Sequence, residues 1–308
     1  MKGLELARGY YEACAKELLK ERFPALFDRM TIGLAGEGSE CFGFDDDYSR
    51  DADFGPAFCI WLDGKDYLRY GQFVQQLYDD LPVMFEGYWT SEDPGVAVKK
   101  RGVLCTPVWY EGFTGFGKGP RVTEQWLRVS DFSLAAATNG QIFKEGKDSA
   151  FMEIRRYLQA GYPEDIRLKR IAMRAVMMGQ AGQANYRRSY ERGEYVAAAL
   201  AAGEFAKAGL CMVYLLNHAY APYYKWLHRG LKGMEKLPRS YELFDRLAKA
   251  APGPETEELI ERICALVIAE MKRQSLTDRD SSQMTAHCGD ILDRIKDQRL
   301  RDMPMVVR

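Results

Sequence analysis

The distribution of helical spacing along the chain places the strongest constraint on its fold. The second half repeats apolar residues at helical spacing in six blocks, with Gly and Pro mostly between them, over 150–160, 164–182, 191–218, 238–250, 255–273 and 282–300. The first half instead mixes short apolar runs, which are typical of strands, with helical segments. The sequence therefore predicts an α/β domain over 1–148, a mixed sheet with flanking helices, followed by an all-α helical-bundle domain over 149–308.

The elements of the first half follow from local patterns. Apolar spacing predicts a helix over 3–22, which Pro24 would stop. Three apolar runs predict strands, and two further segments predict helices. The strands are expected over 30–35, 57–62 and 103–110, and the helices over 65–80 and 122–137.

Composition excludes several classes of protein. The 308 residues carry 43 Lys and Arg against 44 Asp and Glu, so bulk positive charge does not drive binding to nucleic acid. Seven Cys without a CxxC pair, and three His without metal-ligand spacing, argue for reduced thiols and against a structural zinc site. The first residues show no signal-peptide pattern, and no uncharged apolar stretch is long enough for a membrane span. We therefore expect a cytoplasmic protein with no membrane partner.

One segment combines two features that bear on chemistry. Gly38-Ser39 follows an apolar strand-like run, and its backbone N–H groups and hydroxyl could hold phosphate oxygens. Asp51 and Asp53 precede the next strand two residues apart, so both carboxylates leave the same face. Such carboxylates repel each other unless a cation lies between them, and Mg²⁺ is the natural choice beside substrate phosphates. The segment predicts metal-assisted phosphoryl or nucleotidyl transfer.

Each feature alone is more often structural than catalytic. An Asp-x-Asp pair is usually a cap or a solvated turn, and a Gly-Ser turn is commoner still. Their order between two strands favours the functional interpretation. The neighbouring Asp45, Asp46 and Asp47 are expected to form a solvated loop rather than to bind metal.

Gly38-Ser39 followed by Asp51-Ala52-Asp53-Phe54 resembles the signature of the DNA polymerase β-like nucleotidyltransferase superfamily. Members often carry a helical-bundle domain after the α/β domain, as predicted here. The chain is most similar to an uncharacterised bacterial family, a domain of unknown function with a C-terminal helical domain. The segments that carry this second resemblance are Leu134–Phe143, Asn185–Arg188 and Asn217–Trp226.

The resemblance implies a function and a set of site residues. Asp51 and Asp53 would bind Mg²⁺, and Gly38 and Ser39 would contact the phosphates of ATP. The chain would then transfer a nucleoside monophosphate, AMP, to a hydroxyl acceptor, which could be a small molecule, a protein or an RNA end. The superfamily often places a third carboxylate on a later core strand, but the run 103–108 contains no acid. We therefore assign Glu86 as the general base or third carboxylate, with Glu111 as an alternative.

The second domain offers candidate partners for the nucleotide. Pro222 is expected to end or kink a helix ahead of Tyr224 and Lys225. Lys225 and Arg229 are four residues apart, so they face the same way on a helix and could neutralise a triphosphate, while Tyr224 could stack on a base. An aromatic helix–helix interface is the structural alternative for these residues.

Two other functions fit the same sequence. A nucleotide-binding or interaction protein that has lost catalysis would explain the missing third carboxylate. An aminoglycoside-type antibiotic adenylyltransferase would use the same chemistry on a different acceptor.

Overall fold

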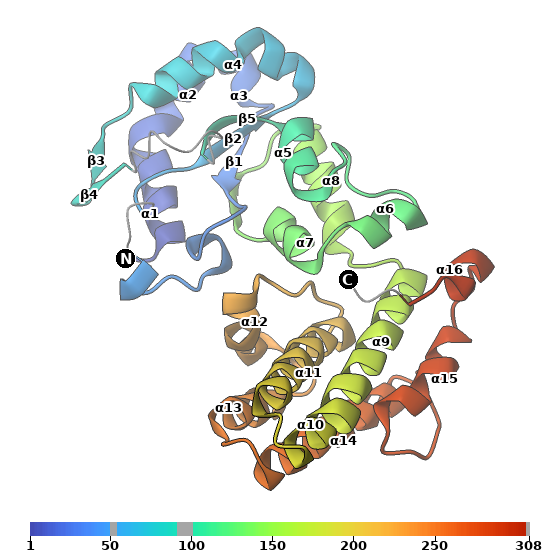
Figure 1. Ribbon diagram of the computed structural model, residues 1–308. Coiled ribbons are helices and arrows are strands. Elements are labelled where there is room, and N and C mark those ends of the chain that lie inside the picture. The colour runs from blue at the N-terminus through green and yellow to red at the C-terminus, as the bar shows by residue number, and fades with distance from the viewer. Residues whose placement is uncertain (50–53, 91–100, 306–308) are drawn as a thin grey trace. The chain divides into compact units, whose positions relative to one another are not determined.

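The computed structural model describes residues 1–49, 54–90 and 101–305. The chain divides into two compact units, Met1–Ala160 and Gly161–Arg308 (Figure 1). The sequence predicts a boundary after residue 148, where helical patterning begins, whereas the first unit also holds α8 (Ala150–Gln159). Hydrophobic packing explains this placement, because Phe151 of α8 stacks on Trp61 of the sheet with ring centroids 4.0 Å apart.

A four-stranded mixed sheet forms the centre of the first unit, with strand order β5-β2-β1-β6. The strands are β1 (Thr31–Leu34), β2 (Cys59–Leu62), β5 (Gly102–Cys105) and β6 (Gln141–Lys144). β1 runs antiparallel to both β2 and β6, and β2 runs parallel to β5. The predicted mixed sheet with flanking helices is confirmed.

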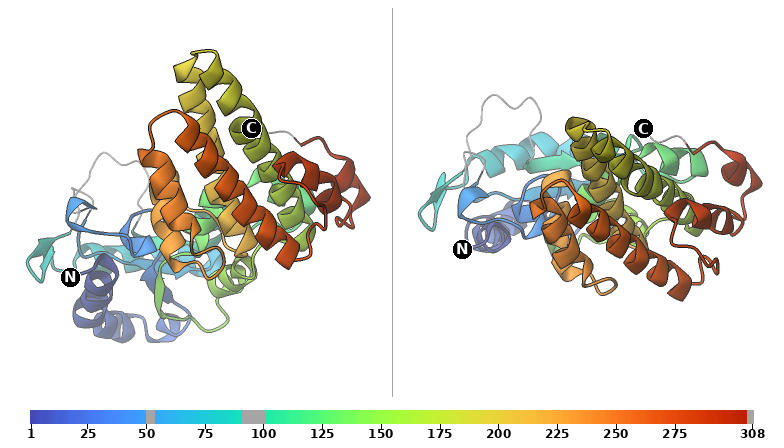
Figure 2. Two further views of the ribbon diagram at one scale, coloured as in Figure 1. Left: turned by 90° about the horizontal axis from the view of Figure 1, so that it is seen from below. Right: turned by 60° about the horizontal axis from the view of Figure 1, so that its bottom comes forward.

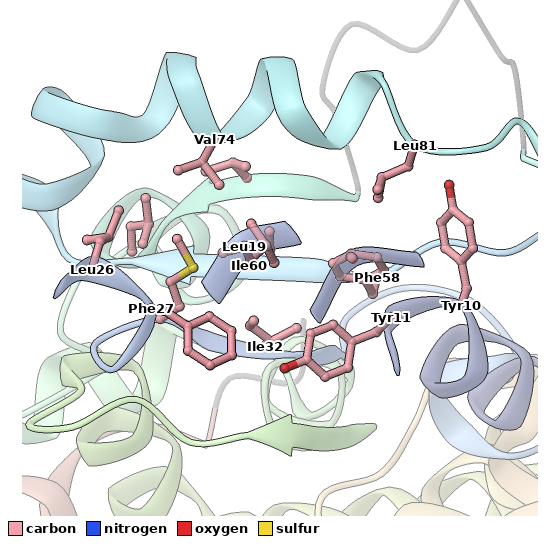
Figure 3. Packing of buried hydrophobic residues seen from close by; sticks show 14 residues of the cluster. Tyr10, Tyr11, Leu19, Leu26, Phe27, Ile32, Phe58, Ile60, Val74 and Leu81 are labelled. Atoms are coloured by element: carbon pink, nitrogen blue, oxygen red, sulfur yellow. The ribbon is translucent and has the colours of Figure 1, made fainter. Parts of the chain in front are cut away.

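Helices from the start of the chain, together with the helix after β2, cover one face of this sheet. They are α1 (Gly3–Tyr10), the π-helical η1 (Tyr11–Ala15), α2 (Lys16–Arg22), α3 (Pro24–Phe27) and α4 (Gly64–Asp79). Ile60 and Ile32 point into the same buried cluster as Leu19 and Val74 (Figure 3). The predicted helix over 3–22 is therefore present as three successive segments that end before Pro24.

Aromatic side chains fill the opposite face. Side chains alternate across a strand, so Trp61 of β2 points away from Ile60. Trp61 packs edge-on against Trp109 of α5 (Thr106–Thr114), with ring centroids 5.6 Å apart, in addition to its stack on Phe151. Burial on both faces explains the continuous apolar run of this central strand.

Two of the predicted elements are wrong in extent. The strand expected over 103–110 ends at Cys105, and α5 begins there, because Pro107 at the start of a helix loses no backbone hydrogen bond. The helix expected over 122–137 is two helices, α6 (Thr123–Arg128) and α7 (Asp131–Thr138). Ser130 separates them, since its side chain accepts the Ser133 N–H and caps α7.

The second unit is helical, as predicted. Its elements are α9 (Glu164–Met178), η4 (Gly179–Tyr186), α10 (Arg187–Glu191), α11 (Tyr195–Leu216), α12 (Tyr224–Gly230), η5 (Leu231–Gly233), α13 (Ser240–Lys249), α14 (Pro254–Arg273), η6 (Met284–His287), α15 (Cys288–Leu292) and α16 (Gln298–Asp302). α11 packs against α9 and α14, and Figure 2 shows these long helices side by side. The helix expected over 282–300 is instead α15 and α16, joined by turns.

Within the described residues, one helix, α11, is long and apolar enough to cross a membrane by length and composition alone. It carries Glu204 and Lys207, and every residue from Cys211 to Leu216 is buried in the second unit. The core helix of a soluble protein passes the same test. The cytoplasmic location stays a prediction.

All seven cysteines lie in the described part of the chain, and all are free thiols. This agrees with the expectation of reduced cysteines.

Candidate functional site

Strand register brings several segments to one edge of the sheet. Gly33 of β1 is opposite Cys59, the first residue of β2, and Cys59 is level with Gly102, the first residue of β5. Leu34 at the end of β1 is opposite Gln141, the first residue of β6. The turn after β1 therefore lies at the same edge of the sheet as the first residues of β2, β5 and β6.

The turn after β1 contains the predicted Gly38 and Ser39, and its backbone requires glycine. Gly36 and Gly38 have φ angles of +112° and +118°. A Cβ atom on Gly38 would collide with the carboxylate of Glu40, and one on Gly36 would lie 3.3 Å from the Phe113 ring. Side chains at these positions would be strained, so both positions favour glycine.

Ser39 is half-buried within this turn. Its carbonyl accepts hydrogen bonds from the N–H groups of Phe42 (3.2 Å) and Phe44 (2.9 Å). Its hydroxyl makes no hydrogen bond with any residue that the structure describes, so the hydroxyl is available to a ligand.

Asn139, in the short loop between α7 and β6, fixes the turn through its side chain. The Gly36 N–H donates to Asn139 Oδ1 (2.8 Å), and Asn139 Nδ2 donates to the Gly36 carbonyl (2.7 Å). Arg155 Nη2 in turn donates to the Asn139 carbonyl (2.6 Å). In the sequence, Asn139 belongs to one of the segments that carry the family resemblance. No local pattern predicts that its side chain forms hydrogen bonds with the backbone of Gly36.

Arg101 brings a positive charge to the same turn. Its Nη2 atom donates to the Glu37 carbonyl (3.0 Å), to Glu40 Oε1 (2.6 Å) and to Cys41 Sγ (3.5 Å). Burial raises the pKa of Cys41 to about 12 and that of Cys59 to about 11, so both thiols are neutral. Among the three groups of the turn that accept a hydrogen bond from Arg101, only the Glu40 carboxylate carries a charge. No sequence signal distinguishes Arg101 from the other arginines.

The predicted metal ligands Asp51 and Asp53 lie outside the described residues, so the magnesium site stays a prediction. Within residues 1–49, 54–90 and 101–305, no three His, Cys, Asp or Glu side chains come together as a metal site.

Glu86 lies at the tip of a β-hairpin, between β3 (Met84–Phe85) and β4 (Tyr88–Trp89). Glu86 and Gly87 both have positive φ angles, +50° and +80°, as a two-residue hairpin turn requires. The Glu86 side chain is exposed. Its position is explained by the turn alone, and its role as a base stays a prediction.

The three acids before Asp51 divide into two kinds. Asp46 and Asp47 are exposed, as expected for a solvated loop. Asp45 is instead 3 % exposed and accepts a hydrogen bond from the Gly3 N–H (3.0 Å). It therefore caps α1, because the first N–H groups of a helix lack partners within it.

Tyr224, Lys225 and Arg229 lie on α12 in the second unit. The Tyr224 ring is 67 % exposed and touches the Tyr223 ring, with centroids 4.5 Å apart. Lys225 is exposed, and the Arg229 guanidinium lies 5.7 Å from the ring of Trp226. Gly38 and Ser39 belong to the other unit, so the predicted union of these residues in one cleft stays a prediction.

The segment before α12 has a structural role. α11 ends at Leu216, ahead of Pro222, as expected for a proline that stops a helix. Asn217 then joins two segments, since its Oδ1 accepts the Lys236 N–H (2.8 Å) and its Nδ2 donates to the Lys236 carbonyl (3.1 Å).

Comparison with known proteins gives limited matches. The family described as domain of unknown function DUF4037 matches residues 126–227, about a third of the chain. This range contains all three segments that carry the expected likeness to an uncharacterised family. No curated protein matches the chain.

A solved structure, a nucleotidyltransferase-like protein from Exiguobacterium sibiricum, aligns over 91% of this chain and 89% of its own. The sequences are 12% identical and the TM-score is 0.35, a likeness too weak to support an argument about this chain.

Proposed function

We propose that this chain is a Mg²⁺-dependent nucleotidyltransferase that transfers AMP from ATP to a hydroxyl acceptor. The observation that supports it best is the turn after β1. This turn has two glycines in a conformation that side chains disfavour, a Ser39 hydroxyl that no described residue engages, and Arg101 beside it. β2 is one of the two strands that pair with β1, and in sequence Asp51 and Asp53 come shortly before β2.

Each residue has a role in this proposal. The N–H groups of the turn and the Ser39 hydroxyl would hold phosphate oxygens, and Asp51 and Asp53 would hold Mg²⁺. When bound, the ion neutralises charge on the phosphates. Arg101 would hold the turn in its observed conformation through Glu37 and Glu40. A carboxylate such as Glu86 would accept the proton of the acceptor hydroxyl.

Calorimetric titration of ATP tests the nucleotide site. We expect Mg²⁺-dependent binding to the wild-type chain and a loss of at least about tenfold in affinity for Asp51→Asn/Asp53→Asn, because the isosteric amides remove two charges from the metal site. Asp46→Asn/Asp47→Asn is a matched control from the same segment and should bind like the wild type. Equal affinity in both double variants, or no ATP binding with Mg²⁺, contradicts the proposal.

A catalytically inactive nucleotide-binding protein is the second candidate. It is favoured by β5, which lies next to β2 and contains no carboxylate where related enzymes often carry a third one. Such a protein would bind ATP as strongly as an enzyme but transfer none of its parts.

A further inference from the structure

A hollow in the first unit is lined by residues other than the phosphate-binding residues proposed above. It has a volume of about 450 Å³, within the range of small-molecule sites. The end of α5, the Gly115-Phe116 segment and the junction of α6 with α7 line this open hollow. Among the described residues that line it, none is acidic.

Aromatic rings form one wall of the hollow. Phe113 and Phe116 both line it. Phe113 is held in place by Trp109, with ring centroids 4.7 Å apart, and lies against Gly36 of the turn after β1. The Phe113 ring therefore contacts both Trp109 and the turn after β1.

A cation and a hydroxyl form the opposite wall. Arg128 is exposed and makes no hydrogen bond or ion pair with any residue in the described part of the chain. The Ser130 hydroxyl donates to Ser133 Oγ (2.8 Å) and accepts the Ser133 N–H (3.2 Å). The hydrogen of the Ser133 hydroxyl is thus left to donate to a ligand.

We propose that this hollow binds a small organic anion. A flat ring of the ligand would lie against Phe113 and Phe116, and its carboxylate or phosphate would accept hydrogen bonds from Arg128 and Ser133. A planar guanidinium suits both kinds of acid. The site goes beyond the proposed transfer reaction, because it uses neither Asp51 and Asp53 nor the turn after β1.

Phenyl phosphate and benzoate are suitable probes, titrated by calorimetry into the full chain without nucleotide or Mg²⁺. Inorganic phosphate carries only the acid group and phenol only the aromatic ring, so both serve as controls. We expect saturable binding of phenyl phosphate or benzoate, with a higher affinity than that of either control. The probe that binds more tightly identifies the acid group. A failure here is distinct from a failure of ATP binding, which is measured separately.

Substitutions of residues that line the hollow test whether the probes bind there. Arg128→Gln and Phe116→Ala should each weaken the better probe about tenfold, as loss of a charged hydrogen bond or of an apolar wall predicts. Arg22→Gln, an exposed arginine of α2, is the matched control and should change nothing. Circular dichroism establishes that each variant is folded. Unchanged affinity in both Arg128→Gln and Phe116→Ala, or no saturable binding of any probe, overturns the proposal.

Discussion

Single residues of the turn after β1 define how the candidate site can be tested. Gly38 matters for its conformation, since any side chain there meets both an unfavourable φ angle and the Glu40 carboxylate. Gly43 offers a contrast a few residues on. Its φ angle is +69°, but a Cβ atom there would meet nothing within 4 Å.

We predict that Gly38→Ala lowers the free energy of unfolding by about 1–3 kcal/mol and weakens ATP binding, because the turn must move to relieve strain. Gly43→Ala should cost less stability and leave ATP binding unchanged. Urea unfolding and calorimetry on both variants measure this. ATP affinity in Gly38→Ala equal to that of the wild type would show that the turn does not contact the nucleotide.

At the scale of single residues, the sequence reveals the glycines of the turn but not their partners. Gly38-Ser39 is recognisable because it stands at the end of an apolar run. Asn139 and Arg101 are not, because they are 100 and 62 residues from Ser39 along the chain, and only strand pairing brings them to the same edge. No local pattern records such a contact.

At the scale of elements, a few polar side chains hold the loop before α15 against that helix. The Thr277 hydroxyl donates to Asp290 Oδ2 (2.7 Å) and lies 2.9 Å from Nδ1 of the buried His287. Arg279 Nη2 donates to Asp290 Oδ1 (2.7 Å). Hydrogen bonds from Arg279 and Thr277 lower the pKa of Asp290 to about 2.

This lowered pKa predicts how stability depends on pH. Asp290 is ionised in the folded chain at a pH where it would already be protonated in the unfolded chain, whose carboxyl has a pKa near 3.9. Its contribution is therefore complete above about pH 4 and is lost as pH falls toward 2. The difference in unfolding free energy between wild type and Asp290→Asn should shrink over this window in urea titrations. A difference that stays constant from pH 6 to 2 would contradict the assigned role.

Prediction of elements succeeds where hydrophobic spacing is long and regular, as in α4, α9 and α14. It fails where a short apolar run could be either strand or helix start, as at 103–110, where Pro107 favours the helix. β6 escapes prediction because its four residues include an exposed Gln141 and a charged Lys144 at the edge of the sheet, so no apolar run marks it. The hairpin β3–β4 escapes it because its strands have two residues each.

The whole chain consists of two units, and each has its own buried core. A unit of about 150 residues buries enough apolar surface to fold alone. We predict that the fragment 161–308 gives a helical circular dichroism spectrum and a cooperative thermal transition. A fragment 149–308, cut at the boundary predicted from sequence, carries α8 without the sheet that buries Phe151, and should aggregate more readily. Failure of 161–308 to unfold cooperatively would show that the units depend on each other.

Label transfer from ATP tests the central claim of nucleotidyl transfer most directly. The wild-type chain, supplied with Mg²⁺ and a cell extract as the source of acceptors, should pass label from α-³²P-ATP but not from γ-³²P-ATP, because pyrophosphate leaves. Asp51→Asn/Asp53→Asn should reduce this transfer at least about 100-fold, since the metal contributes several kcal/mol to the transition state. Transfer of the γ label, or ATP binding without transfer of either label, would contradict the account.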